Sequence, residues 1–387
     1  MEDRVLVVSP RPARPDGRGD QRRTAEILRA LSGQYDVTTL SWLPDVGAGD
    51  WRAPTSGHRR WAEWVRAAAG AAVLPAQVAY VQSLAPATLA RDVEGYDLVV
   101  FVTDRAVPRR LLRGPSLVDF IDDLGEQARR RGRAAGGPVG LLWRIEGRRL
   151  HRFDRRVARR AQLSVAHSAA DAAGIDPGVG VVPLSIAPAG PPETGLPVTG
   201  LPGTGHKVVF LGNLFYRPNH EAAIWICRHL APRMAALGVA PGDIVVAGRR
   251  PPPDLVAAAG HAGVDLRADV DDLSTVLAEA AVVLAPMALG VGFLYKILDA
   301  CGAGRACVLS PLANAGLDLV DGESALIAVR EPDAFAQAVV SLLDDPSLRA
   351  RISANAQAHV APYQPAQVDA TWQRLVRETI EAARVSK

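Results

Sequence analysis

Short continuous apolar runs alternate with amphipathic segments along most of the chain. The apolar runs are typical of strands buried on both faces of a parallel sheet, and they fall at residues 4–9, 37–40, 98–101, 116–120, 164–167, 179–183, 207–211, 244–247, 264–267, 281–285, 306–309 and 325–328. Segments with helical periodicity lie between them, at residues 21–32, 129–160, 219–237, 254–259, 273–279, 294–303, 331–343, 347–359 and 364–385. Strands that alternate with helices predict an α/β fold with doubly wound parallel sheets.

One stretch interrupts this alternation. Residues 186–205 (IAPAGPPETGLPVTGLPGTG) have no hydrophobic period and are dense in proline and glycine, which is typical of a linker. A chain of 387 residues is also too long for one ordinary core. We therefore expect a Rossmann-like domain over residues 1–188, a linker over 189–206, a second Rossmann-like domain over 207–363 and a terminal helix over 364–387.

The stretch from Ala281 to Ser310 (AVVLAPMALGVGFLYKILDACGAGRACVLS) predicts a strand, a glycine loop, a helix and a further strand. Such a loop presents backbone N–H groups and a helix N-terminus to an anion. Lys296 lies in the first turn of the helix, and Asp299 follows three residues later on the same face. A lysine there can hold a diphosphate, and the carboxylate can accept hydrogen bonds from a ribose. The alternative is an ordinary surface ion pair.

The N-terminal half repeats the pattern. Residues 10–20 (PRPARPDGRGD) contain Gly17 and Gly19 between a predicted strand and a predicted helix. The segment is either a loop over a ligand site or a flexible connection. Asp122 and Asp123 follow another strand, so their carboxylates lie at its C-terminal end or cap the next helix. His167 ends the following strand at the same sheet edge.

Arginines crowd residues 129–160, where Trp143, Ile145, Leu150, Phe153 and Val157 recur at helical spacing. This predicts one amphipathic helix with an arginine-rich outer face. A second basic patch with tryptophans lies at residues 59–66. Both are typical of solvated faces, and the open alternative is docking on acidic lipid or substrate.

Charge is unevenly distributed along the chain, whose net charge is +3. Residues 1–190 carry 28 Arg and Lys against 21 Asp and Glu (+7), and the remainder carries 16 against 20 (−4). The basic half can attract an anionic ligand, a phospholipid surface or an acidic acceptor. We find no signature of a nucleic-acid-binding module. Three cysteines in apolar contexts, an N-terminus that leads straight into a strand, and apolar runs below about 18 residues predict a cytoplasmic protein.

Several passages together resemble a known family. They are VVFLGNLFYRPNHEAAIWI (208–226), IVVAGRRPPPDL (244–255), GVGFLYKILDACGAGRACVLS (290–310) and, in the N-terminal half, VVSPRPARPDGRGDQRR, LVDFIDDLGEQARRR and RIEGRRLHRFDRRVARR. In this order they resemble the family 4 glycosyltransferases of the GT-B fold, in particular a bacterial sugar-transferase branch.

The resemblance implies two Rossmann-like domains facing across a cleft. The first binds the acceptor, the second binds a nucleotide-diphosphate sugar, and the terminal helix crosses back to the N-terminal domain. The implied reaction is hexosyl transfer with retained anomeric configuration, without a metal ion or cofactor. The implied acceptor is a hydroxyl of a small-molecule specialised metabolite, as in natural product biosynthesis, or of a glycan. A peripheral contact with the inner face of the membrane, through the basic half, is a further expectation.

The resemblance also assigns residues. The residues expected to take part in the reaction are Asp122, Asp123, His167 and Lys296. Those expected at the donor are Gly17, Gly19, Gly212, Asn213, Arg249, Gly290, Val291, Gly292, Phe293, Lys296 and Asp299. The family's Glu-x7-Glu motif is incomplete here, because its first position is Val291 and its second is Asp299. Its Pro-Asn-Gly segment before the linker is replaced by Pro183-Leu184-Ser185.

Catalysis of this kind needs stabilisation of the leaving diphosphate rather than a protein nucleophile. We find no Ser-His-Asp order, Cys/His pair or metal-ligand spacing in the sequence. Two other classes stay open. One is a GT-B enzyme of another reaction type, either a nucleotide-sugar epimerase or a pseudo-glycosyltransferase. The other is a non-catalytic nucleotide-sugar binder.

Overall fold

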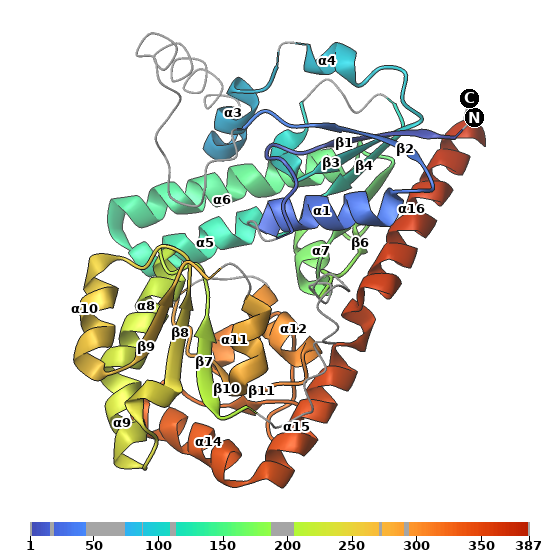
Figure 1. Ribbon diagram of the computed structural model, residues 1–387. Coiled ribbons are helices and arrows are strands. Elements are labelled where there is room, and N and C mark those ends of the chain that lie inside the picture. The colour runs from blue at the N-terminus through green and yellow to red at the C-terminus, as the bar shows by residue number, and fades with distance from the viewer. Residues whose placement is uncertain are drawn as a thin grey trace. The chain divides into compact units, whose positions relative to one another are not determined.

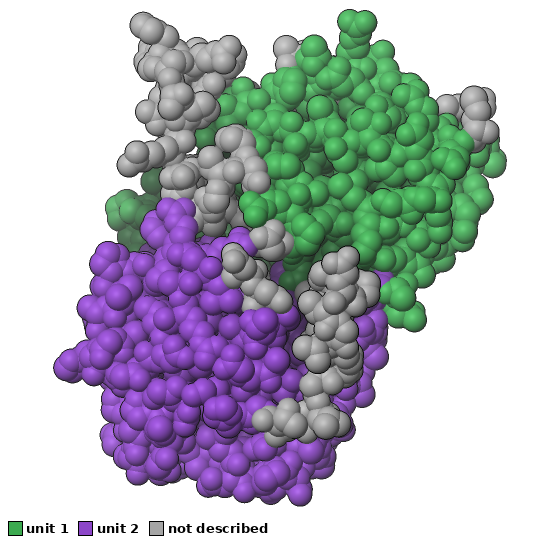
Figure 2. Space-filling model, viewed as in Figure 1, with its two compact units in different colours: residues 1–185, 366–387 green, residues 186–365 purple. Residues whose placement is uncertain are grey.

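The computed structural model describes residues 2–15, 19–43, 74–86, 88–108, 114–186, 205–270, 273–289 and 294–385. The chain divides into two compact units, which Figure 2 colours separately. Unit 1 comprises residues 1–185 and 366–387, and unit 2 comprises residues 186–365.

Unit 1 is built on a parallel sheet in the order β2-β1-β3-β4-β5-β6, with helices around it (Figure 1). Its strands are β1 (Arg4–Val8), β2 (Asp36–Leu40), β3 (Leu98–Val102), β4 (Ser116–Asp119), β5 (Leu163–Ala166) and β6 (Gly180–Val181). Its helices are α1 (Gly19–Leu31), α3 (Ala76–Ser83), α4 (Leu89–Asp92), α5 (Leu124–Ala135), α6 (Gly137–Ala158), α7 (Ala169–Ile175) and α16 (Pro365–Val385), with a 3-10 turn at Asp104–Ala106.

Unit 2 is built on a second parallel sheet, in the order β12-β11-β10-β7-β8-β9. Its strands are β7 (Lys207–Leu211), β8 (Ile244–Gly248), β9 (Asp265–Ala268), β10 (Ala280–Ala285), β11 (Ala306–Leu309) and β12 (Leu326–Ile327). Its helices are α8 (Arg217–Trp225), which continues through a π-helical turn (Ile226–Leu230) into α9 (Ala231–Ala236), then α10 (Pro253–Ala262), α11 (Leu273–Glu279), α12 (Tyr295–Gly302), α13 (Pro311–Asn314), α14 (Pro332–Asp344) and α15 (Pro346–His359).

Every strand predicted from an apolar run is present, and the predicted α/β class with doubly wound parallel sheets is confirmed. The central strands β3, β8 and β10 are buried at every position. A strand covered by helices on both faces must be apolar throughout, so its sequence reads as a continuous hydrophobic run. None of the helices in the described residues is long and apolar enough to cross a membrane.

The terminal helix packs on the sheet of unit 1, as the sequence resemblance implies. Val368, Trp372, Val376 and Ile380 of α16 join one buried cluster with residues of β1, β3 and β4. Trp372 is among the largest side chains buried in the molecule. The helix therefore completes the core of unit 1, although it is the last segment of the chain.

The arginine-rich segment 129–160, predicted as one helix, is instead an antiparallel pair, α5 and α6 (Figure 1). Gly136 and Gly137 have φ angles of 60° and 52°, a left-handed backbone that glycine adopts without strain and that ends the first helix. The prediction also placed Ile145 on the core side, but its side chain is 44% exposed. The recurring apolar residues from Trp143 to Val157 all lie in α6, so their spacing gives no information on the break before it.

Four glycines bring α5 and α6 into close contact. A Cβ added at Gly140 would lie 2.6 Å from the carbonyl oxygen of Gly132, and one at Gly147 would lie 2.9 Å from that of Gly125. The glycines are spaced seven residues apart on each helix, so Gly125 faces Gly147 and Gly132 faces Gly140. No side chain separates the two backbones at these positions.

We expect Gly140→Ala to lower the free energy of unfolding by about 1–3 kcal/mol, because the methyl group overlaps backbone that cannot rotate away. Gly260→Ala is the matched control, since an added Cβ in that helix meets nothing within 4 Å. That change should stabilise the protein by about 0.5–1 kcal/mol through helix propensity. Urea denaturation of both variants measures the difference. Equal effects would contradict the close packing.

Candidate functional site

The sheet of unit 2 reverses its strand order between β7 and β10. From β7 the chain adds β8 and β9 on one side, and β10, β11 and β12 on the other. In open α/β sheets, ligands bind at the carboxyl ends of the strands beside such a reversal. The residues that follow β7, β8 and β10 are therefore the first candidates for a site.

Lys296 lies at this reversal. It is the second residue of α12, and its Nζ donates a hydrogen bond to Oδ1 of Asn219 at 2.7 Å. The same ammonium lies 4.2 Å from the centre of the Phe210 ring, which belongs to β7. Lys296 thus joins an element that follows β10 to residues of β7 and α8.

The lysine is held without a negative partner. No carboxylate among the described residues forms an ion pair with Lys296, and its polar contacts are Asn219 and the sulfur of Met287 at 3.9 Å. Burial lowers the pKa of Lys296 to about 7, because water no longer solvates the charged form. A half-buried cation without a counter-ion is suited to receive an anionic ligand.

Two glycines let the ends of β7 and β8 approach each other. A Cβ at Gly248 would lie 1.6 Å from the carbonyl oxygen of Gly212, and one at Gly212 would lie 2.8 Å from the side chain of Asn219. Gly212 therefore leaves space for the amide that holds Lys296. The backbone N–H of Leu214 donates to the carbonyl of Arg249 at 3.0 Å, which ties the two strand ends together.

Asn213 shapes the turn after β7. Its side-chain oxygen accepts from the backbone N–H of Phe215 at 3.2 Å, and its carbonyl accepts from Nδ2 of Asn219 at the same distance. The structure thus brings Gly212, Asn213 and Lys296 together through Asn219, and Arg249 is tied to the same turn through its backbone.

Asp299 shares the face of α12 that carries Lys296, as predicted. Lys296, Asp299 and Gly302 are half-buried, whereas Ile297, Leu298, Ala300 and Cys301 turn into the core. Of the other predicted donor residues, Gly19 begins α1 in unit 1. Gly17 and the loop residues Gly290, Val291, Gly292 and Phe293 lie outside the described part of the chain.

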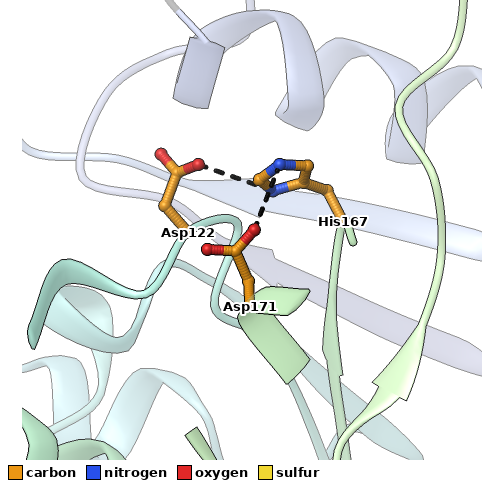
Figure 3. Close-up of side chains that lie close together, drawn as sticks. All are labelled: Asp122, His167 and Asp171. Atoms are coloured by element: carbon orange, nitrogen blue, oxygen red, sulfur yellow. Dashed lines mark ion pairs between the residues drawn. The ribbon is translucent and has the colours of Figure 1, made fainter. Parts of the chain in front are cut away.

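In unit 1, the predicted residues Asp122 and His167 meet at the carboxyl ends of β4 and β5. Nδ1 of His167 lies 3.5 Å from Oδ1 of Asp122, and Nε2 lies 3.5 Å from Oδ2 of Asp171 on α7. Figure 3 shows both carboxylates beside the imidazole, each joined to it by an ion pair. The His167 side chain is 1% exposed and that of Asp122 is 31% exposed, so the carboxylate is the accessible member.

Backbone contacts hold this cluster in place. Nδ1 of His167 makes a close hydrogen bond with the carbonyl of Ile121, a residue whose φ is 65°. Oδ1 of Asp119 accepts from the N–H of the same Ile121 at 3.0 Å. These bonds fix the direction in which Asp122 points. Burial raises the pKa of Asp122 above its ordinary range, and the adjacent His167 partly offsets that shift.

Asp123 has a structural role in the described residues. It is 4% exposed, and its Oδ1 caps α5 by accepting from the N–H of Glu126 at 2.7 Å. A Cβ at Gly174 would lie 2.5 Å from its other carboxylate oxygen. The capping alternative weighed in the sequence analysis therefore holds for Asp123, and any part in the reaction stays a prediction.

The same cluster is a candidate metal-ligand set, although the sequence shows no metal-ligand spacing. Ligand atoms of Asp122, His167 and Asp171 all lie within 4.8 Å of one another. Two carboxylates and one imidazole nitrogen are an acceptable donor set for a divalent cation. The sequence spacing gave no signal, because Asp122 follows a different strand from the other two.

A second acidic pair is buried in unit 1. Asp104 and Asp154 are 1% and 2% exposed, and both oxygens of Asp104 and Oδ1 of Asp154 lack a hydrogen-bond partner in the described residues. Burial raises the pKa of Asp104. Burial, and then the charge of Asp104, raise the pKa of Asp154 well above its ordinary value of 3.8. The pair therefore releases its protons at a higher pH in the folded state than in the unfolded chain.

This pair predicts a pH dependence of stability. Unfolded aspartate releases its proton near pH 3.8, while folded Asp154 keeps it, so the folded state holds more protons above that pH. Stability should fall as pH rises from about 4 towards the raised pKa. We expect Asp154→Asn to reduce this fall, so that the variant gains on wild type with rising pH, while buried Asp104 still contributes a smaller fall.

Asp176→Asn should behave oppositely, because a backbone N–H of Gly178 and the charge of Arg159 lower the pKa of Asp176. Wild type should exceed this variant above about pH 4. Urea midpoints between pH 4 and 8 measure both series. Parallel profiles for wild type and Asp154→Asn would contradict the retained proton.

Sequence reasoning missed the residues that position the predicted ones. Asn219 lies inside one of the passages that carry the family resemblance, but nothing in its spacing assigns it to Lys296. Asp171 lies four residues after His167, a helical spacing that could have suggested the pair. Arg330 bonds the carbonyl of Pro286 at 2.7 Å and Glu221 at 2.6 Å, which fastens the segment after β10 to α8.

Comparison with known proteins supplies a family match. Residues 205–345 match the family model described as glycosyl transferases group 1. A phosphatidyl-myo-inositol mannosyltransferase of Mycolicibacterium smegmatis is 31% identical over 232 residues, which are 59% of this chain and 56% of that protein. The chain therefore matches little more than half the length of this curated relative.

Solved structures agree on the fold. Anabaena HepE in complex with UDP aligns with a TM-score of 0.61 at 14% identity, over 97% of this chain and 100% of the other. A trehalose-phosphate synthase from Burkholderia vietnamiensis aligns with a TM-score of 0.66 at 15% identity, over 99% and 98%. The predicted two-domain GT-B fold and the glycosyltransferase resemblance are confirmed, and membership of family 4 stays a prediction.

Proposed function

Because residues 205–345 match the group 1 glycosyl transferases and the whole chain has the GT-B fold, we propose that this protein is a glycosyltransferase. It moves a sugar from a nucleoside-diphosphate donor to a hydroxyl of a small-molecule or glycan acceptor, with retention of anomeric configuration. The observation that carries the proposal is Lys296. Its ammonium lies at the reversal point of a parallel sheet and has no carboxylate partner in the described residues.

The assigned roles follow from charge and position. Lys296 and the N-terminus of α12 stabilise the negative charge that develops on the leaving diphosphate. Asn219 directs the ammonium, and Gly212 leaves the room that Asn219 needs. Asp299 accepts hydrogen bonds from the ribose, and Arg249 adds positive charge beside the nucleotide. The named relatives support the donor class, because HepE is described in complex with UDP and with UDP-glucose.

In unit 1 we assign Asp122, whose carboxylate is accessible, to a contact with the transferred sugar. We assign His167 to holding Asp122 in position. In the reaction, the bond from C1 of the sugar to the diphosphate oxygen breaks, and a bond from C1 to the acceptor oxygen forms. The acceptor proton leaves with the diphosphate or to solvent. We propose that no metal ion takes part, so a chelator should leave the rate unchanged. A chelator-sensitive rate would assign a cation to Asp122, His167 and Asp171.

The test is incubation with a panel of UDP, GDP, dTDP, ADP and CDP sugars, followed by proton NMR. With water as the acceptor, a retaining transferase should release free sugar in the donor's own anomeric configuration before mutarotation. Asp122→Asn should slow this release by about tenfold or more while donor binding persists, because the charged side chain acts on the transition state. Release of the opposite anomer would contradict retention.

The same incubation separates the alternatives. Conversion of the donor into an isomeric nucleotide sugar would indicate an epimerase. A donor that is bound but never consumed, with or without a panel of hydroxyl acceptors, would indicate a nucleotide-sugar binder. Either outcome would replace the transferase proposal, and both would leave the donor site of unit 2 in place.

A further inference from the structure

The tip of the α5–α6 pair is uncharged and exposed. Residues 134–142 (AAGGPVGLL) contain no charged side chain, and all but Gly140 are exposed. Val139, Leu141 and Leu142 are 56%, 53% and 67% exposed, and Ile145 one turn further is 44% exposed. These are four of the six exposed large apolar residues among the described residues of unit 1, and all four lie on α6. We call residues 134–145 the tip.

Arginines surround the tip on both helices. Residues 124–160 contain twelve arginines and three acidic residues, a net charge of +9. On α5, Arg129, Arg130 and Arg133 contact Glu126. On α6, Arg148, Arg152 and Arg156 have no carboxylate partner within the described residues. Their charges are therefore available to an external anion.

The tip and these arginines share one side of α6. Leu141, Ile145, Arg148, Arg152 and Arg156 follow one another at spacings of three or four residues, so their side chains form one stripe. The opposite side packs into unit 1 through Leu150, Phe153 and Val157. The glycine contacts between α5 and α6 leave this stripe uncovered by α5.

We propose that this stripe docks unit 1 on an anionic lipid surface. The apolar tip enters the interface between headgroups and acyl chains, and the three arginines lie on the acidic headgroups. An interfacial helix of this kind combines apolar side chains with arginines that reach the polar layer. Trp143 does not belong to the stripe, because its half-buried ring packs against the core of unit 1 and lies 5.3 Å from the guanidinium of Arg131.

The positive charge of the stripe argues against a second copy of the chain as its binding partner. A two-fold symmetric contact would bring the same arginine stripe against itself, and like charges across an interface are unfavourable. An anionic membrane offers instead an extended negative surface beside an apolar layer, which matches both parts of the stripe. This docking does not depend on the reaction proposed above.

The experiment is binding of the full chain to vesicles, without nucleotide or acceptor. Phosphatidylglycerol vesicles should bind the protein at low ionic strength, pure phosphatidylcholine vesicles should not, and added salt should weaken the binding. Arg148→Gln, Arg152→Gln and Arg156→Gln together should reduce affinity by about a hundredfold. The control Arg228→Gln, Arg351→Gln and Arg377→Gln removes the same charge from other exposed sites and should change little.

The tip is tested separately. Leu141→Glu with Leu142→Glu should reduce binding by about tenfold or more, because apolar area contributes directly to interfacial affinity. Val256→Glu with Val329→Glu, at exposed positions of unit 2, is the matched control. A fluorophore on Leu142→Cys should shift to the blue on vesicles. The native cysteines Cys227, Cys301 and Cys307 are buried, which favours labelling at the new site.

Absence of binding to phosphatidylglycerol vesicles by wild type would overturn the proposal. So would equal binding by the arginine variant and its control, or equal binding to neutral vesicles. A concentration-dependent dimer that Leu141→Glu with Leu142→Glu dissociates, without lipid binding, would assign the stripe to a second copy. Retention on an acidic protein matrix but not on vesicles would assign it to an acidic protein partner. Donor binding and sugar transfer are measured in separate experiments, so none of these outcomes bears on the proposed reaction.

Discussion

Replacing Lys296 by methionine should raise the stability of the ligand-free protein and weaken its binding of a nucleotide sugar. Methionine keeps much of the side chain's length and apolar character but needs no solvation of a charge. The lysine ammonium lies over an aromatic ring and has one amide partner, without a carboxylate among the described residues. The poorly solvated ammonium therefore lowers the stability of the ligand-free protein, and a bound anionic ligand offsets this cost.

The stability gain of Lys296→Met should depend on pH, and the lowered pKa of Lys296 sets the direction of that dependence. The pKa of Lys296 is about 7 in the folded protein, against an ordinary 10.5, so between these values the unfolded chain carries a proton that the folded protein lacks. Wild-type stability should therefore rise with pH across this range. The advantage of Lys296→Met should be largest below pH 7 and fade towards pH 10.5. Thermal denaturation at several pH values measures it.

Lys207→Met is the matched control for this prediction. Lys207 donates to Asp243 at 2.7 Å, so its removal deletes an ion pair rather than an unpaired cation. It should leave the protein slightly less stable and its nucleotide binding unchanged. If Lys296→Met lowered the melting temperature as Lys207→Met does, the interpretation of Lys296 as a destabilising ligand-binding residue would be wrong.

Arg23→Met should lower the free energy of unfolding by about 3–5 kcal/mol, the usual cost of leaving a buried charge without its partner. Nε of Arg23 donates to Asp119 at 2.6 Å, and neither side chain is exposed. The two Nη atoms donate to the carbonyls of Pro183 and Val182, each at 2.7 Å. The guanidinium also lies 4.8 Å from the ring of Trp372, so one side chain joins α1, β4 and α16.

Two further variants distinguish the loss of this buried ion pair from the loss of any arginine. Arg29→Met removes the half-exposed pair with Asp369 from the same helix and should cost about 1 kcal/mol or less. Adding Asp119→Leu to Arg23→Met should recover part of the lost stability, because one of the two buried carboxylates that Arg23 contacts is then gone, while Glu26 and the N–H of Ile121 remain without these partners. Urea denaturation followed by tryptophan fluorescence measures all three. A loss at Arg23 no larger than that at Arg29 would contradict the buried network.

The sequence predicts the sheets well for a physical reason. Strands such as β8 and β10 are buried on both faces, so they must be continuously apolar, and this signal is local. The first turn of α12 and the shared face of Lys296 and Asp299 are equally local, because helical spacing fixes them. These features follow from neighbouring residues alone.

The features that escaped prediction depend on residues distant in sequence. Lys296 contacts Asn219, which lies 77 positions earlier, and no local spacing pairs the two residues. The break at Gly136 is a different case, because the recurring apolar residues from Trp143 to Val157 all follow it and no apolar period spans it. Ile145 is exposed because glycine contacts, rather than side chains, join α5 to α6. Periodicity records burial along one element, but not which element covers it.

The most direct test of the donor site is calorimetric titration of wild type and Lys296→Met with UDP-, GDP-, dTDP-, ADP- and CDP-sugars. A nucleotide sugar has no titrating phosphate near pH 7, so proton uptake on binding at pH 8 reports on Lys296 itself. One donor should bind wild type with uptake of protons, and the variant should bind it about thirtyfold more weakly or worse. Binding of that donor with equal affinity to both proteins, or binding of none, would contradict the assignment of Lys296 to the diphosphate.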